Sequence, residues 1–117
     1  MTDIPTDCLF CKIIAGEIPA QIVYRDEQVI AIRDINPVAP VHLLVLPIRH
    51  INSIAEAQAS DAALLGALAL TAARLAAEAG LARGYRLVIN TGADGGQSVS
   101  HLHEHVIGGR KMRWPPG

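Results

Sequence analysis

Three histidines stand at alternate positions in residues 101–107, whose sequence is His-Leu-His-Glu-His-Val-Ile. Alternate side chains leave the same face of a β-strand, so on a strand the three imidazoles form one row, with about 6.5 to 7 Å between successive Cα atoms. On a helix only His101 and His105 would share a face. The branched residues Val106 and Ile107 favour the strand. Because imidazole binds metals and can act as a nucleophile, the row predicts a metal site or phosphate chemistry, with a purely structural role as the third alternative.

A glycine-rich loop, residues 90–98, precedes the histidine row and ends in Gln97 and Ser98. Backbone N–H groups of such a loop can cradle a phosphate, because glycine permits positive φ and close approach. The loop lacks the Gly-Lys-Ser/Thr ending of a Walker A motif and the G-x-G-x-x-G pattern of dinucleotide-binding folds. By itself it is as consistent with a plain turn as with a phosphate site.

Two more groups of residues have the chemistry of a site. His42 precedes the apolar run 43–46, which is typical of a core histidine, but beside the row it becomes a candidate to orient another imidazole. Cys8 and Cys11 form a C-x-x-C pair. In a reducing compartment this spacing indicates a metal or redox pair before a structural disulfide, with zinc or free thiols as the alternatives.

Few elements are available to position these residues, because 117 residues suffice for one domain with one core. A short helix is predicted over 8–15, with Asp7 as its N-cap and Gly16 as its stop. Strands are predicted at 22–24, 29–32, 42–46, 85–89 and the histidine row, the first two joined as a hairpin. We therefore expect one α+β domain over residues 1–117, with a five-stranded, mostly antiparallel sheet, one long helix and the short N-terminal helix.

The long helix is predicted between Ser60 and Gly80. Its main apolar stripe comprises Leu64, Leu68, Ala72, Leu75 and Ala79. The other sides of the helix are also mostly alanine and leucine, which predicts burial on two sides, against its own sheet and against a partner subunit.

Charge and hydropathy exclude several classes of partner. A net charge of −1 and a pI near 6.5 give no basic field, which argues against long nucleic acid and anionic membrane surfaces. The longest apolar run, residues 62–73, is about 12 residues, against the roughly 20 that a membrane span requires. Met1-Thr2-Asp3 is not the basic start of a signal peptide, so we expect a cytoplasmic protein that binds a small ligand.

The run His-x-His-x-His-x-x resembles the signature of the histidine triad (HIT) superfamily, and the chain from Cys8 to Gly117 is similar to its histidine triad nucleotide-binding (HINT) branch. The blocks that match in order are 34–37, 42–47, Asn90 with 95–98, and the tail 108–117. The resemblance implies a HIT-like fold, a homodimer with a joined larger sheet, and a purine nucleotide (AMP or GMP type) as ligand. It implies a phosphoramidase that cleaves the P–N bond of nucleoside 5′-phosphoramidates. Alternatives are a dinucleoside polyphosphate hydrolase, a nucleotide-binding regulatory module with incidental activity, and a metal-dependent hydrolase that uses the row as ligands.

Roles for individual residues follow from the same resemblance. His103 would attack the α-phosphorus to give a nucleotidyl-histidine, supported by His42 and His101, while His105, Ser98 and the loop amides hold the phosphate oxygens. Asp34 would hold the ribose hydroxyls and Asn90 would lie near the α-phosphate. The remaining nucleotide contacts would be Phe10, Ile13, Ile18, Ile32, Ile35, Gln97 and Val99, of which the apolar ones are equally understandable as core. The Trp114-Pro115-Pro116 tail would reach towards the partner's active site.

Two features qualify the resemblance. Relatives with the N-terminal cysteine pair bind zinc with two histidines, which here would be His50 and His101, giving a closed structural Cys2His2 site; no organic cofactor is implied. Glu104 occupies a position that is usually apolar. Strand alternation turns it away from the histidines, where a buried carboxylate needs water, a cation or a raised pKa.

Overall fold

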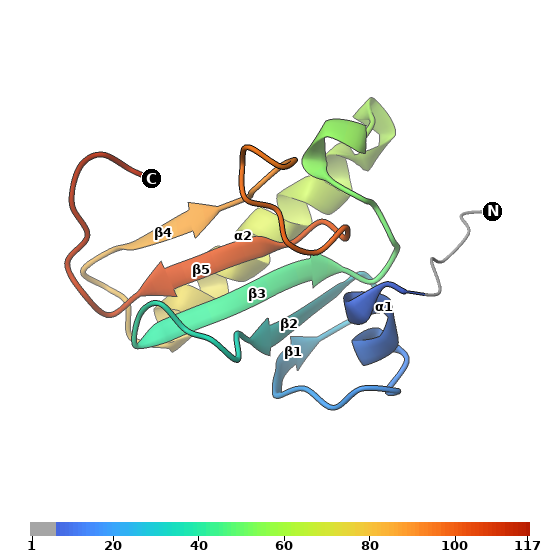
Figure 1. Ribbon diagram of the computed structural model, residues 1–117. Helices are drawn as coiled ribbons and strands as arrows, with labels where there is room; N and C mark the ends of the chain where they lie inside the picture. The colour runs from blue at the N-terminus through green and yellow to red at the C-terminus, as the bar shows by residue number, and fades with distance from the viewer. Residues whose placement is uncertain (1–6) are drawn as a thin grey trace.

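A single antiparallel sheet forms the centre of the protein in the computed structural model, which describes residues 7–117 (Figure 1). Its strands are β1 (Ile22–Arg25), β2 (Val29–Arg33), β3 (Val41–Pro47), β4 (Tyr85–Val88) and β5 (Glu104–Gly108). They lie in the order β1-β2-β3-β5-β4, and every neighbouring pair is antiparallel. The predicted α+β class, five-stranded sheet and β1–β2 hairpin are therefore confirmed. The prediction of one domain over 1–117 stays a prediction, because residues 1–6 and the start Met1-Thr2-Asp3 lie outside the described residues.

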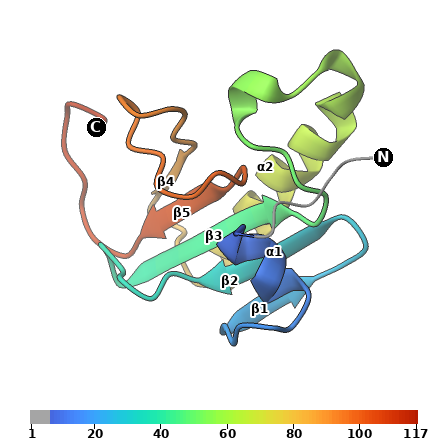
Figure 2. The ribbon, with the colours of Figure 1, turned by 45° about the vertical axis from the view of Figure 1, so that its right-hand side comes forward.

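Helix α2 (Ala62–Glu78) covers one face of the sheet, as both ribbon views show (Figures 1 and 2). Its buried residues are Leu68, Ala72, Leu75 and Ala76, which pack with alternate residues of β2, β3 and β5 in one apolar cluster. Val45 and Val106 belong to that cluster and are fully buried. Alternate residues of the strands and a 3.6-residue stripe on the helix therefore meet in one core.

The bounds of the long helix differ from the prediction. Two 3₁₀ turns, Ile54–Glu56 and Ala59–Asp61, precede α2, so the α-helix begins two residues after Ser60. Gly80 stops it as predicted, with φ of 81° and with Leu81 N–H donating to the Ala76 carbonyl at 3.0 Å. Ala79 was expected in the buried stripe and is exposed, because the helix ends there and Ala76 takes the buried position.

The segment Ala59–Glu78 is long and apolar enough to pass as a membrane span by length and composition alone. Here α2 packs one face on the sheet, which explains part of its hydropathy. Only 33% of its most apolar window is buried within the single chain. Leu70 on its outer face is 74% exposed, so apolar surface remains uncovered there.

Helix α1 (Leu9–Ile14) lies against the opposite face of the sheet (Figure 2). Its Phe10 and Ile13 form a second apolar cluster with Ile30 and Ile32 of β2 and with Leu44 and Leu46 of β3. Asp7 is not its N-cap: the cap is Cys8, whose Sγ accepts from the Cys11 N–H at 3.2 Å. The sulfur replaces the predicted carboxylate because the C-x-x-C spacing sets it beside the first free amides.

The histidine row is only partly a strand, because β5 begins at Glu104. Residues 101–103 leave the ladder at the point where Pro47, which lacks an N–H, ends β3. Leu102 N–H donates to the Ile51 carbonyl at 2.7 Å, and His101 donates from Nε2 to the Pro47 carbonyl at 2.8 Å. The predicted strand 85–89 likewise ends one residue early, at Val88.

Candidate active site and metal centre

His42 and His105 form a hydrogen-bonded pair on the sheet face that α2 leaves open. His105 pairs with Leu44 across β3 and β5, which places it on the same face as His42. The His42 Nε2 to His105 Nδ1 distance is 2.9 Å, and Val38 N–H donates to His42 Nδ1 at 3.1 Å. Since His42 Nδ1 accepts, the neutral ring carries its proton on Nε2 and donates it to His105 Nδ1.

The same bonds decide the tautomer of His105. Its Nδ1 accepts from His42, so its proton is on Nε2, and Nε2 is buried with no hydrogen-bond partner among the described residues. Burial, and then repulsion by His103 and His42, lower the pKa of His105 to about 4. The ring is therefore neutral at pH 7 and presents an unused N–H donor. A buried, unsatisfied donor at a site is a group that a ligand can complete.

His103 offers the complementary group. Its Nδ1 donates to the His101 carbonyl at 2.7 Å, which leaves the lone pair on Nε2 without a partner among the described residues. The ring is 5% exposed and stacks edge-on with Phe10, with 5.1 Å between ring centroids. The His103 and His105 centroids are also 5.1 Å apart. A free imidazole lone pair thus lies beside a free imidazole N–H.

Helix α1 reaches this site through Phe10, and the end of the glycine-rich loop lies against the start of α1. Ser98 and Val99 line a hollow of about 360 Å³ together with Cys8, Leu9 and Asn52. Gln97 is used within the loop: its amide donates to the Asn52 and Val99 carbonyls, and its Oε1 accepts from the Gly92 N–H. Gly95 is required there, because a Cβ would lie 2.3 Å from the Thr91 carbonyl oxygen. Gln97 therefore braces the loop, and Ser98 remains exposed beside it.

The other predicted nucleotide contacts lie at different depths. Asp34 is half-buried, with Oδ2 3.4 Å from His42 Nε2 and Oδ1 accepting from the Asn36 N–H. Asn90 and Ile18 are partly buried, whereas Ile35 is 88% exposed. Phe10, Ile13 and Ile32 are buried in the cluster under α1, so they serve packing at least as much as any ligand.

The four predicted metal ligands come together although they arise from three separate segments. Their donor atoms Cys8 Sγ, Cys11 Sγ, His50 Nδ1 and His101 Nδ1 all lie within 4.8 Å of one another. The sulfur to nitrogen distances are 3.4, 3.3 and 3.5 Å, and the two Nδ1 atoms are 3.1 Å apart. A tetrahedral zinc with usual bond lengths separates its ligands by about 3.5 Å for N to S and about 3.3 Å for N to N.

Protonation also fits a cation at this cluster. His101 donates from Nε2 to the Pro47 carbonyl and His50 donates from Nε2 to Asn52 Oδ1 at 2.6 Å, so the neutral rings direct two Nδ1 lone pairs at each other. Burial and the adjacent Cys8 raise the pKa of Cys11 to about 12. A cation between the four atoms would remove the repulsion of the lone pairs and favour thiolates. The residues therefore fit a closed Cys2His2 metal site.

Asp34, His42 and His105 form a second set of close donor atoms, within 4.8 Å of one another. This set fits a metal poorly. Coordination through His42 Nε2 would move the ring proton to Nδ1, where the Val38 N–H already points. Two donors would then face each other, so the existing contacts favour a hydrogen-bonded pair over a metal at these three residues.

Comparison with known proteins agrees with the fold. The HIT domain family model matches residues 15–112. The chain belongs to the HIT domain family. A HIT-like protein of Synechococcus elongatus is 56% identical over 111 residues, covering 95% of this chain and 97% of that protein. The crystal structure of a HIT family hydrolase from Legionella pneumophila is 50% identical with a TM-score of 0.93, covering 95% of this chain and 100% of that one.

A second solved relative, a HIT family hydrolase from Clostridium thermocellum, is 47% identical with a TM-score of 0.91 and covers 94% of this chain and 96% of that one. These names support hydrolase chemistry in general for the HIT domain described here. They do not separate the HINT branch from the rest of the family.

Sequence reasoning missed the residues that orient the imidazoles. The Val38 N–H fixes the tautomer of His42, and the Pro47 carbonyl fixes that of His101, so both act through the backbone. The Asn52 side chain fixes the tautomer of His50. The residue types in a sequence do not show which backbone groups will bond to a histidine. Asn52 did carry a signal, since it stands two residues after a predicted ligand and metal-bound histidines usually have such an oxygen partner.

Proposed function

We propose that this protein is a HINT-type nucleotide hydrolase that cleaves the P–N bond of purine nucleoside 5′-phosphoramidates, with His103 as nucleophile. One observation carries the proposal: the unpaired lone pair of His103 Nε2 lies beside the unpaired N–H of His105. A phosphoryl group needs both, an in-line nucleophile and a donor for its oxygens. The Nδ1–H tautomer of His103 supplies the first and the Nε2–H tautomer of His105 supplies the second.

The reaction then proceeds in two displacements. His103 Nε2 bonds to the α-phosphorus, the P–N bond breaks, and the leaving nitrogen takes a proton from solvent to depart as an amine. Water next attacks the phosphorus, the His103 N–P bond breaks, and the nucleoside monophosphate leaves with a proton passing to solvent. His105 Nε2–H and the exposed Ser98 hydroxyl hold the phosphate oxygens. The buried carbonyl of His101 fixes the orientation of His103 throughout.

Nucleotide recognition would use the borders of the histidine row. Asp34 Oδ2 lies 3.4 Å from His42 Nε2, and the carboxylate is partly open to solvent, which suits ribose hydroxyls. Asn90 would lie near the α-phosphate. The exposed Ile35, with Ile18 and the edge of Phe10, would provide apolar surface for a purine base.

We also propose zinc as the metal of the Cys2His2 cluster, because two thiols and two imidazoles are the donor set that zinc prefers. Zinc would supply structural cohesion there, since four protein ligands leave no position for a substrate. Cys8, Cys11, His50 and His101 would tie α1 to the segments that flank β3 and β5. His103 stays outside the cluster because its Nδ1 is engaged by the His101 carbonyl.

A homodimer in the cytoplasm completes the proposal. The outer face of α2 and the free edge strand β4 expose Leu70, Tyr85 and Leu87. Tyr85 and Leu87 pair with Gly108 and Val106 and thus share the α2 face of the sheet. Two copies related by a two-fold axis would cover this surface and join their sheets at β4. Paired thiols without a disulfide suit a reducing compartment.

The test is turnover of adenosine and guanosine 5′-phosphoramidates, compared with dinucleoside polyphosphates, by wild type and His103→Ala. We expect cleavage of the phosphoramidates, with kcat lowered by about 10³-fold or more in the variant and nucleotide binding retained. Brief chelator treatment should leave turnover of the folded enzyme in place. If His103→Ala keeps more than about a tenth of the rate, or if polyphosphates are the better substrates, the proposed function is wrong.

A further inference from the structure

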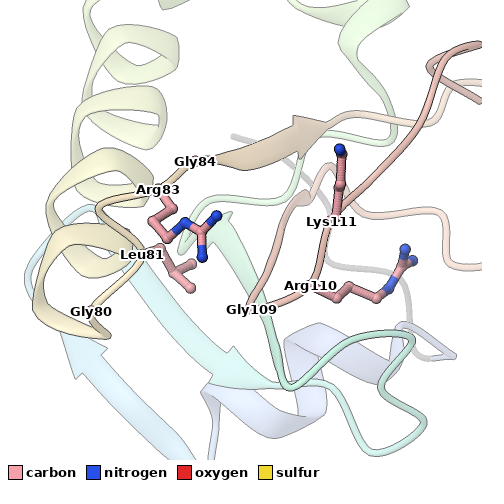
Figure 3. A pocket seen from close by; sticks show the side chains of 7 residues that line it. All are labelled: Gly80, Leu81, Arg83, Gly84, Gly109, Arg110 and Lys111. Atoms are coloured by element: carbon pink, nitrogen blue, oxygen red, sulfur yellow. The ribbon is translucent and has the colours of Figure 1, made fainter.

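The turn that follows β5 packs against the loop between β2 and β3. Gly109 has φ of 94°, and a Cβ on it would lie 2.9 Å from Pro40 Cβ, so only glycine fits the contact. This contact sets the next residue, Arg110, over the loop, and Arg110 Nε donates to the Val38 carbonyl at 3.1 Å. Arg110 borders a cleft of about 420 Å³, but Figure 3 shows its side chain directed away from Arg83.

Val38 is therefore held at both of its backbone polar groups. Its carbonyl accepts from Arg110, and its N–H donates to His42 Nδ1 at 3.1 Å. Few other hydrogen bonds hold the loop between β2 and β3. Pro37 and Pro40 have no N–H. Asp34 N–H donates to the His42 carbonyl at 3.0 Å and closes the base of the loop, and Asp34 Oδ1 accepts from the Asn36 N–H, but neither bond holds Val38 itself.

A continuous set of hydrogen bonds thus leads from the surface to the histidine pair. Arg110 holds Val38, Val38 sets the proton of His42 on Nε2, and His42 sets the proton of His105 on Nε2. If the Val38 N–H moved away, His42 would be free to carry its proton on Nδ1. His105 Nδ1 would then lose the hydrogen bond from His42 Nε2–H. In a fraction of the protein molecules the His105 proton would move to Nδ1, and Nε2 would present a lone pair to the substrate.

We propose that Arg110 is a positioning residue that, through Val38, keeps His42 and His105 in the tautomers that present the His105 Nε2–H to the substrate. The catalytic part of this inference rests on the proposed function. The tautomer part rests on the hydrogen bonds alone, so it holds for any substrate.

Two variants separate the hydrogen bond from the charge. Gln Nε2 stands the same number of bonds from Cβ as Arg Nε, so Arg110→Gln keeps a donor and loses the charge. Arg110→Met keeps an unbranched chain and loses both. Lys111→Met is the matched control, because it removes a neighbouring exposed cation that has no hydrogen bond to Val38.

The readout is the set of ring ¹⁵N shifts of His42 and His105, measured with kcat and KM for an adenosine phosphoramidate. We expect both rings as Nε2–H tautomers in wild type, Arg110→Gln and Lys111→Met. Arg110→Met should show mixed tautomers for both, with kcat lowered about tenfold and KM little changed, which is the scale of one lost hydrogen bond to a charged group. The His103 shifts should stay those of an Nδ1–H ring and show that the fold is intact.

Wild-type tautomers in Arg110→Met would overturn the inference. The same loss of the Nε2–H tautomers in Arg110→Gln as in Arg110→Met would also overturn it, because the glutamine keeps a donor. Mixed tautomers with unchanged kcat would overturn the positioning role. Absence of phosphoramidase activity in wild type would refute the proposed function, and the ¹⁵N shifts would still decide the tautomer claim.

Discussion

Replacing Glu104 by leucine should stabilise the protein, because Glu104 is a buried carboxyl without a full set of partners. It pairs with Val45 across β3 and β5 on the α2 face, is 4% exposed, and has an Oε1 with no hydrogen-bond partner among the described residues. No described side chain places a cation beside it. Burial raises its pKa, which is one of the alternatives that the sequence left open.

The size and pH dependence of the effect follow from these facts. An unsatisfied buried polar group costs about 1 to 3 kcal/mol, so Glu104→Leu should raise the free energy of unfolding by about that amount at pH 7. The folded pKa lies above the ordinary value of 4.5. As pH rises through 4.5, the unfolded state therefore loses its proton first and the folded state binds more protons than the unfolded state. Stability is then lost as pH rises from 4.5 towards the folded pKa, at about 1.4 kcal/mol for each unit of elevation.

Urea unfolding at pH 4.5, 6 and 8 would measure this, at one protein concentration because a dimer's stability depends on it. Glu104→Gln is the matched control, since its amide keeps the shape and cannot ionise. Differences between variants cancel the titration of the histidines and thiols. A leucine variant less stable than wild type, or a gap between wild type and Glu104→Gln that does not widen above pH 4.5, would refute the reasoning.

Three more results are expected. The double variant Cys8→Ser, Cys11→Ser should release about one zinc per chain and have a lower melting temperature, while kcat at low temperature falls only modestly. Elemental analysis that finds no metal in wild-type protein would refute the metal site. Sedimentation should show a dimer rather than a 12.4 kDa monomer, and deleting residues 113–117 should change substrate preference more than stability. An NMR titration should find His105 neutral from pH 8 to about 5, since its pKa is about 4. Because the unfolded ring takes up a proton near 6.5, this group's stabilisation is lost as pH falls from 6.5 towards 4; a midpoint near 6.5 would contradict it.

The fold was predictable where residue type and period agree. Apolar runs bounded by turn or proline residues identified the central strands at 29–32 and 42–46, and Gly80 identified the end of α2. The start of β5 was not predictable, because it depends on where Pro47 ends a strand distant in sequence. Cys8 became the cap of α1 for the same kind of reason, since its sulfur sits beside the Cys11 amide.

The candidate site could be predicted in its residue types but not in its protonation. The C-x-x-C pair and the resemblance of His50 and His101 to known ligands named a metal set that the structure brings together. Which nitrogen of His42 or His105 carries the proton depends on the Val38 amide, a backbone group in a loop. The raised pKa of Glu104 depends on its burial without a hydrogen-bond partner for Oε1 among the described residues, which no local sequence pattern encodes.

The central claim is that His103 forms a covalent bond to phosphorus, and trapping that bond tests it most directly. Wild-type protein mixed with adenosine phosphoramidate labelled at the phosphorus should be quenched within one turnover and digested for mass spectrometry. We expect label on the peptide that contains His103, at the ring nitrogen, and none in His103→Ala. Label on His105, or full turnover with no adduct on any residue at every quench time, would contradict covalent catalysis by His103.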